Sequence, residues 1–245
     1  MKNTLRHIAA ILILIVFPAH LTAQGEWKLI LEEDNIALYA RELKGHTESQ
    51  YKGITTVIRP IETVGSVLSD TASYPGWFFK CIEAKKLSTE DSSKLHFFLY
   101  IVIDTPWPFS DRDVIYETEI TINHASEKVV IRSSALKEAL IPLKRQYVRI
   151  TDSEHQWILE KISDAQTRIT FINRTNAAGT FASYLSNPGM RDTTFHSLKN
   201  LSKILSIRKA EPAAPGMAPF QEWSSRYNRF YQGTFSPEVD DSLKR

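Results

Sequence analysis

Between residues 96 and 175 the chain is a succession of short segments with the composition of β-strands, separated by polar turns. The segments are 96–103, 114–122, 129–135, 146–151 with 156–160, and 167–175. In the second of them, Val114, Tyr116, Thr118, Ile120 and Ile122 alternate with Glu117, Glu119 and Thr121. A period of two residues indicates strands of a sheet with one covered face. Polar loops at 123–126 and 163–165 are typical of hairpins, so we expect antiparallel pairing.

Helices are predicted on both sides of these strands. Pro60 opens the first one, because proline at the start of a helix loses no hydrogen bond. Its apolar face is Ile61, Val64, Val67 and Leu68, and the last helix, at 188–208, has the stripe Phe195, Leu198, Leu201 and Leu205. Further strands are expected at 36–43 and 51–58, a short amphipathic start at 27–31, and a turn or short helix at 74–77. The fold class is therefore α+β, with a curved antiparallel sheet around a long C-terminal helix and an internal space suited to an apolar ligand.

The first 23 residues have the pattern of a signal peptide. Lys2 and Arg6 precede a run of ten apolar residues at 8–17, and Ala23 offers a small residue at a cleavage site. Such a run is too short to span a bilayer, which takes roughly 20 residues. We expect cleavage near Ala23 and a periplasmic or secreted protein, the alternative being an uncleaved N-terminal anchor.

Composition favours one folded domain followed by a tail. The chain has 245 residues, of which 42% are hydrophobic, which is ample for a packed core. We expect one domain at 24–208, with a Pro/Ala-rich linker and an aromatic tail at 209–245. Charge is balanced, with 30 Lys and Arg against 28 Asp and Glu, and 28 against 28 without residues 1–23. This balance argues against nucleic acid as a partner, and we expect a monomer.

Motifs for catalysis, metal ions or cofactors are not found in the sequence. The histidines form no HxH or HExxH pattern, and no GxSxG, P-loop or GxGxxG is present. Cys81 is the one cysteine, which excludes an internal disulfide and favours a small buried side chain. We therefore expect no metal site, no cofactor and no covalent chemistry.

The most unusual segment is 104–113, DTPWPFSDRD. Two prolines around a tryptophan do not fit inside a sheet ladder, so this segment is predicted to be a rigid crossover between strands. Arg112 and Asp113 then begin the next strand, and their side chains point to opposite faces, so each needs its own partner. Two interpretations remain open: a structural corner held by charge-assisted hydrogen bonds, or a loop that gates the mouth of a cavity.

This segment resembles the PWPxSxRD signature of START domains, the lipid-transfer domains related to steroidogenic acute regulatory protein. The matching residues are Pro106, Trp107, Pro108, Ser110, Arg112 and Asp113. Weaker similarities are found at 70–77 and at 176–181, and directly after the second of these Ala182 replaces a proline that is usual in the family. In all, the resemblance covers about residues 27–208.

The resemblance implies a helix-grip fold, in which the sheet encloses a tunnel for one lipid, and it implies carriage rather than catalysis. Transient contact with membranes would accompany such a role. Animal sterol-binding members have a buried acidic and a buried basic residue in the tunnel. The corresponding positions here are Leu99 and Thr118, which favours a mostly apolar cavity with hydroxyl or amide contacts.

The strand phase predicts which side chains contact the ligand. Wall residues are expected to be Leu99, Ile101, Tyr116, Thr118, Ile131, Ser133, Phe171 and Asn173, with Phe195, Leu198 and Leu201 as the lid. A strand shift of one residue would exchange each wall residue for its neighbour.

Two alternative functions remain open. An enzyme of the polyketide cyclase or aromatase type would use Tyr116, Asn173 and His196 to orient its substrate. An extracytoplasmic interaction module would use the aromatic tail at 223–235 as its contact surface.

Overall fold

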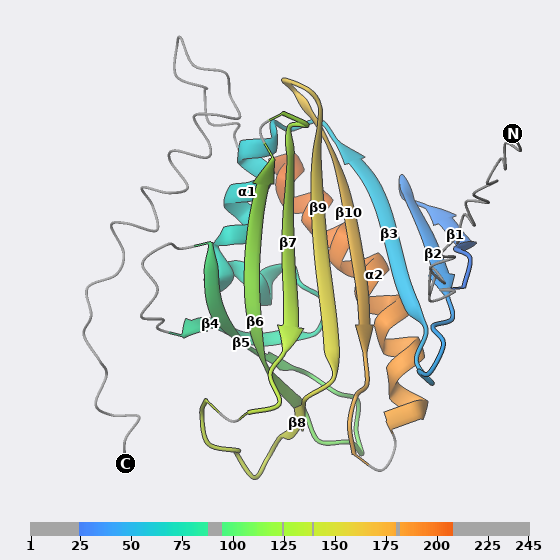
Figure 1. Ribbon diagram of the computed structural model, residues 1–245, viewed down its shortest axis with the longest axis vertical. Coiled ribbons are helices and arrows are strands. Elements are labelled where there is room, and N and C mark those ends of the chain that lie inside the picture. The colour runs from blue at the N-terminus through green and yellow to red at the C-terminus, as the bar shows by residue number, and fades with distance from the viewer. Residues whose placement is uncertain (1–24, 88–94, 124, 139, 180–181, 208–245) are drawn as a thin grey trace, which may run out of the picture.

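The computed structural model describes residues 25–87, 95–123, 125–138, 140–179 and 182–207 (Figure 1). The predicted signal peptide and the tail at 209–245 lie outside these residues and stay predictions, so the contact surface at 223–235 does too. No helix in the described ranges is both long and apolar enough to cross a bilayer.

The strands form one curled ten-stranded sheet. They are β1 (Lys28–Glu33), β2 (Ile36–Arg41), β3 (Gln50–Val57), β4 (Cys81–Leu87), β5 (His96–Ile103), β6 (Arg112–Asn123), β7 (Lys128–Ala135), β8 (Val148–Ile150), β9 (Ser153–Ser163) and β10 (Gln166–Thr175). Their order is β1-β2-β3-β10-β9-β7-β6-β5-β4, and β8 pairs with β6. The pairs along this order are antiparallel, which confirms the predicted α+β helix-grip fold.

The short strand β8 is an exception that the hairpin loops do not predict, because it runs parallel to β6. A long connection after β7 brings the chain back along the start of β6 in the same direction, as a parallel pair requires. Two edge strands also differ from the prediction. The expected amphipathic start at 27–31 belongs to β1, whose six residues are all exposed. The strand β4 is difficult to detect in the sequence because its charged side chains interrupt the alternation of apolar and polar residues.

The long helix α2 (Ala182–Ile207) crosses the concave face of the sheet, behind β9, β10 and β3 in Figure 1. It starts before the predicted residue, so Pro188 lies inside it. A proline inside a helix removes one hydrogen bond. The added turn is held from outside, because Ser186 Oγ accepts from the Ala177 N–H and Asn187 Oδ1 accepts from the Ser49 N–H, both at 2.9 Å.

The helix α1 (Ile61–Ser69) and the 3₁₀ helix η1 (Thr71–Gly76) close one end of the sheet. As predicted, α1 follows Pro60 and buries the face with Ile61, Val64, Val67 and Leu68. The Tyr74 hydroxyl donates to the Leu68 carbonyl at 2.8 Å and fixes η1 against α1. The opposite end, where α2 begins, carries the loops discussed below.

Candidate functional site

A cavity of about 830 Å³ lies between the first half of α2 and the sheet. Its walls come from β5, the start of β6, β8 and the segment 185–193 of α2, and its rim from the connection between β5 and β6. Six of its apolar wall residues are Phe78, Phe79, Ile101, Ile103, Val114 and Ile150. This volume lies in the range of cavities that enclose small organic molecules, roughly 300–1,000 Å³.

The signature segment forms the rim of this cavity. The Thr105 N–H donates to Asp111 Oδ1 at 2.9 Å, and the Phe109 N–H donates to the Pro106 carbonyl at 3.1 Å. The peptide bond before Pro108 is cis. Trp107 is 92% exposed although it also lines the cavity, so its ring stands at the mouth. The segment is thus both a hydrogen-bonded corner and part of the cavity mouth.

Arg112 and Asp113 lie on opposite faces of β6. Asp113 is 1% exposed and pairs with Arg149 through two contacts of 2.8 Å, and it also accepts from the Tyr100 hydroxyl at 3.3 Å. Arg112 lines the cavity instead, where Nη1 donates to the Ser110 carbonyl and Nε to the Ala177 carbonyl. The carboxylate is therefore neutralised by an ion pair, whereas the guanidinium contacts only carbonyl oxygens among the described residues.

A group of hydrogen-bonded polar side chains forms part of the inner wall. The Tyr116 hydroxyl contacts Ser153 Oγ at 2.8 Å and His155 Nε2 at 3.1 Å, and Ser153 contacts Thr175 Oγ1 at 2.6 Å. Burial lowers the pKa of His155 to about 4 and raises the pKa of Tyr116. Both groups are therefore neutral near pH 7, so this wall offers hydrogen bonds without charge.

Aromatic side chains close the inner end of the cavity. Trp157 stacks on Phe171 with ring centroids 3.9 Å apart, and Trp77 meets Trp157 edge-on at 6.0 Å. Phe78 lines the cavity on one side and a void of about 20 Å³ on the other. The expected tunnel is thus a cavity at one end of the sheet, because rings from β9, β10 and the segment after η1 fill the rest.

The structure divides the predicted ligand contacts into three groups. Ile101 and Tyr116 line the large cavity, whereas Leu99, Thr118, Ile131 and Ser133 line only the small void. Phe171 belongs to the aromatic cluster, and Asn173, Phe195, Leu198 and Leu201 line neither space. The strand phase itself is as expected, since Leu99, Ile101, Tyr116 and Thr118 each line the cavity or the small void, whereas their neighbours Tyr100, Val102 and Ile115 form a separate cluster.

The expected lid residues are placed differently because α2 begins earlier than predicted. Phe195, Leu198 and Leu201 pack in the core, and Leu198 touches the backbone of β3 at Gly53. The part of α2 that covers the cavity is 185–193 instead.

Sequence reasoning missed Phe78, Val114 and His155 as cavity residues. Val114 shares the strand phase of Tyr116, which is a usable signal. His155 was not predicted because the sequence indicates a break in the strand between residues 151 and 156. In the structure β9 runs without a break from Ser153 to Ser163.

The residues suggested for an enzyme do not meet at one site. Tyr116 lines the cavity, but Asn173 is fully buried and its Oδ1 accepts from the Thr194 hydroxyl at 3.2 Å. His196 stacks on Phe79 at 4.8 Å and does not line the cavity.

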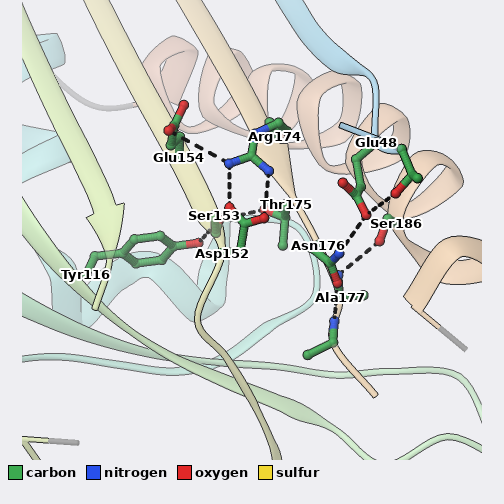
Figure 2. A network of polar contacts seen from close by, with 12 residues as sticks. Glu48, Tyr116, Asp152, Ser153, Glu154, Arg174, Thr175, Asn176, Ala177 and Ser186 are labelled. Atoms are coloured by element: carbon green, nitrogen blue, oxygen red, sulfur yellow. Dashed lines mark hydrogen bonds and ion pairs between the residues drawn. The ribbon is translucent and has the colours of Figure 1, made fainter. Parts of the chain in front are cut away.

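A polar network beside the cavity ties β9 and β10 to α2 (Figure 2). Figure 2 shows Arg174 between Asp152 and Glu154, with Nη1 and Nη2 of Arg174 at 3.0 and 2.5 Å from the Asp152 carboxylate. The same figure shows the Asn176 amide donating to Glu48 at 2.7 Å. The guanidinium lowers the pKa of Asp152.

One group in the described residues brings together three possible metal ligands, from His46, Glu48 and Asp152, within 4.8 Å of one another. Both carboxylates already have donors, Arg174 for Asp152 and Asn176 for Glu48, so the group is explained without an ion. Cys81 is buried, and burial raises the pKa of its thiol to about 12, as expected for a structural side chain.

Comparisons with known proteins agree with this fold. No model of a known protein family matches the chain. An uncharacterised protein of Pseudomonas aeruginosa is 27% identical over 183 residues, which cover 75% of this chain and 88% of that protein. A crystal structure of a STAR-related lipid transfer protein from Xanthomonas axonopodis is 25% identical, with a TM-score of 0.66 over 74% of this chain and 98% of that one.

The fold is also similar to that of human STARD10, at 16% identity, with a TM-score of 0.67 over 86% of this chain and 82% of that one. The signature segment occupies the connection between β5 and β6, at the rim of the cavity. In its helix-grip fold the chain is therefore similar to START-domain proteins, whose signature its segment 106–113 resembles.

Proposed function

We propose that this protein binds one lipid-like molecule without covalent chemistry and carries it between membranes outside the cytoplasm. The observation that carries the proposal is the cavity of about 830 Å³ with its wall of aliphatic and aromatic side chains. The similarity to a bacterial STAR-related lipid transfer protein supports the same class of ligand.

The expected affinity suits a carrier. Enclosing roughly 400 Å² of apolar ligand surface contributes on the order of 10 kcal/mol before the costs of association. At the low end of those costs, about 4 kcal/mol, about 6 kcal/mol remains, which corresponds to a dissociation constant of roughly tens of micromolar. A ligand held in this range is retained in water and still released at a membrane.

An apolar surface beside the cavity mouth fits contact with a bilayer. Trp107 is 92% exposed, and Leu143 and Leu140 are 65% and 48% exposed. The two connections that carry these residues meet at their ends, where the Val148 N–H donates to the Asp111 carbonyl at 2.9 Å. The basic side chains Lys137, Lys144 and Arg145 are exposed in the same connection as the leucines. Exposed tryptophan with basic neighbours favours the interface of an anionic membrane.

The location outside the cytoplasm rests on the N-terminal sequence. Fractionation of cells that express the full chain, followed by N-terminal sequencing, tests it. A mature protein that begins near Gln24 is expected in the extracytoplasmic fraction, and an intact N-terminus in the cytoplasm would contradict this part of the proposal.

The cavity is tested with one filling variant and one matched control. Ile103→Trp places a larger side chain in the cavity wall, whereas Ile162→Trp makes the same change on an exposed part of β9. Native mass spectrometry of the wild type is expected to detect bound lipid, and a fluorescent lipid is expected to bind at least about tenfold more weakly to Ile103→Trp only. A wild type that carries no lipid and binds none would refute the proposed function.

A further inference from the structure

One charged side chain in the cavity wall is almost completely buried. Arg112 is 5% exposed, and its guanidinium makes two hydrogen bonds, from Nη1 to the Ser110 carbonyl at 2.5 Å and from Nε to the Ala177 carbonyl at 3.2 Å. It makes no ion pair within the described part of the chain, and no hydrogen bond from Nη2. The side chain lines the cavity, so an unpaired donor is available to a ligand there.

The other buried guanidiniums of the described chain each have a carboxylate partner. Arg149 and Arg174, with side chains 8% and 3% exposed, each form a two-pronged pair with a carboxylate, Asp113 and Asp152 respectively. Removing a charge from water is costly unless an opposite charge compensates for it. Arg112 meets this cost only through neutral carbonyl groups, which indicates that an anion completes the site.

Neighbouring charges do not neutralise Arg112. The Lys80 ammonium and the Asp104 carboxylate pair with each other at 2.5 Å, and both are more than 40% exposed. Asp192, also in the wall, pairs with Arg191 at 2.9 Å. Burial lowers the pKa of Arg112 while the nearby Asp111 acts in the opposite direction, and an arginine side chain remains charged in either case.

The surroundings of Arg112 restrict the kind of anion. The wall beside it on β6 and β8 is apolar at Val114 and Ile150, and the Tyr116 and His155 group further in is neutral. A small hydrated anion would leave this apolar wall uncovered. An acidic group at the end of a hydrocarbon chain satisfies both the guanidinium and the wall, because arginine binds carboxylate and phosphate through paired hydrogen bonds.

We propose that the ligand is an anionic amphiphile, whose carboxylate or phosphate binds the guanidinium of Arg112 while its hydrocarbon chain occupies the cavity. The inference rests on the proposed function and adds the charge of the ligand to it.

The first test compares ligands that differ only in the head group, so it needs no mutation. Dodecanoic acid, dodecyl phosphate and dodecanol compete with a bound fluorescent lipid at pH 7.5, each below its aggregation limit. The two acids are expected to bind about ten- to a hundredfold more tightly than the alcohol, the range for hydrogen bonds to a charged partner. Inorganic phosphate alone is expected to displace nothing.

The second test uses variants of Arg112. Arg112→Gln is expected to lower the affinity for dodecanoic acid at least about tenfold and to change the affinity for dodecanol by no more than about twofold. Arg112→Lys is expected to keep part of the preference for the acid. Arg132→Gln, at an exposed position of β7, is the matched control and should change neither. If Arg112→Gln does not fold, the wild-type comparison and Arg112→Lys still decide the question.

The outcomes separate this inference from the proposed function. If dodecanol binds as tightly as the acids, the anionic ligand is refuted and lipid carriage stands. If inorganic phosphate displaces the probe by itself, the site holds a free anion and the amphiphile is refuted. If none of the three amphiphiles and no lipid binds, both proposals fail.

Discussion

Lowering the pH should destabilise the ligand-free protein through one histidine of the cavity wall. The ring of His155 lies against Tyr116, Phe78 and Phe171, with centroid distances of 4.7, 6.1 and 5.6 Å. No charged group contributes to its pKa shift, which is due to burial and lowers the value from 6.5 to about 4. The folded protein therefore resists protonation of this ring.

The sign and the magnitude follow from the two pKa values. Above pH 6.5 the ring is neutral in the folded and unfolded chains, and it contributes nothing to the pH dependence. Between pH 6.5 and 4 the unfolded chain binds a proton that the folded chain does not, so the free energy of unfolding falls by up to about 1.4 kcal/mol per pH unit. The loss is about 2 kcal/mol at pH 5 and about 3 kcal/mol at pH 4, as upper values because water in the cavity reduces the penalty.

Urea denaturation of wild type and His155→Gln between pH 7 and 5 measures this loss. The difference in unfolding free energy between the two proteins should shrink by about 2 kcal/mol over that range. Tyr116→Phe is the control, because it removes the hydroxyl that contacts the ring but leaves the ring buried, so its pH slope should equal that of the wild type. Equal slopes for wild type and His155→Gln would refute the reasoning, as would an NMR titration that places the ring's pKa above 6.

Three other predictions concern packing, an ion pair and the cavity mouth. Gly53→Ala should lower the free energy of unfolding by about 1–3 kcal/mol in urea denaturation, because its Cβ would overlap Leu198 Cδ1, and a double-mutant cycle with Leu198→Ala should show coupling. Asp113→Ala should lower the free energy of unfolding by about 3–5 kcal/mol, also measured by urea denaturation, because it leaves the buried Arg149 unpaired. A stability equal to that of the wild type would contradict this. Trp107→Ala should keep the melting temperature but slow lipid transfer between vesicles, and an unchanged transfer rate would argue against contact of this ring with membranes.

Much of the fold could be predicted because its signals are local. The alternation in β6 and the proline before α1 each report on a few neighbouring residues, and the structure has strand and helix where they indicate. The start of α2 could not be predicted in this way. Pro188 gives a strong local signal, but the turn before it is held by hydrogen bonds that the Ala177 and Ser49 N–H groups donate to Ser186 and Asn187.

The site shows the same division. The sequence by itself indicated a rigid crossover between β5 and β6 and determined that Arg112 and Asp113 face opposite ways, since prolines and strand alternation act within a few residues. Only the tertiary structure decided which of the two charges has an ionic partner: Arg149 reaches Asp113 from β8, while Arg112 faces the cavity. It also decided where the cavity lies, because rings from separate segments, Trp77, Trp157 and Phe171, meet in the interior and fill one end of it. Space inside a protein depends on how distant side chains pack together, and that packing has no counterpart in local sequence pattern.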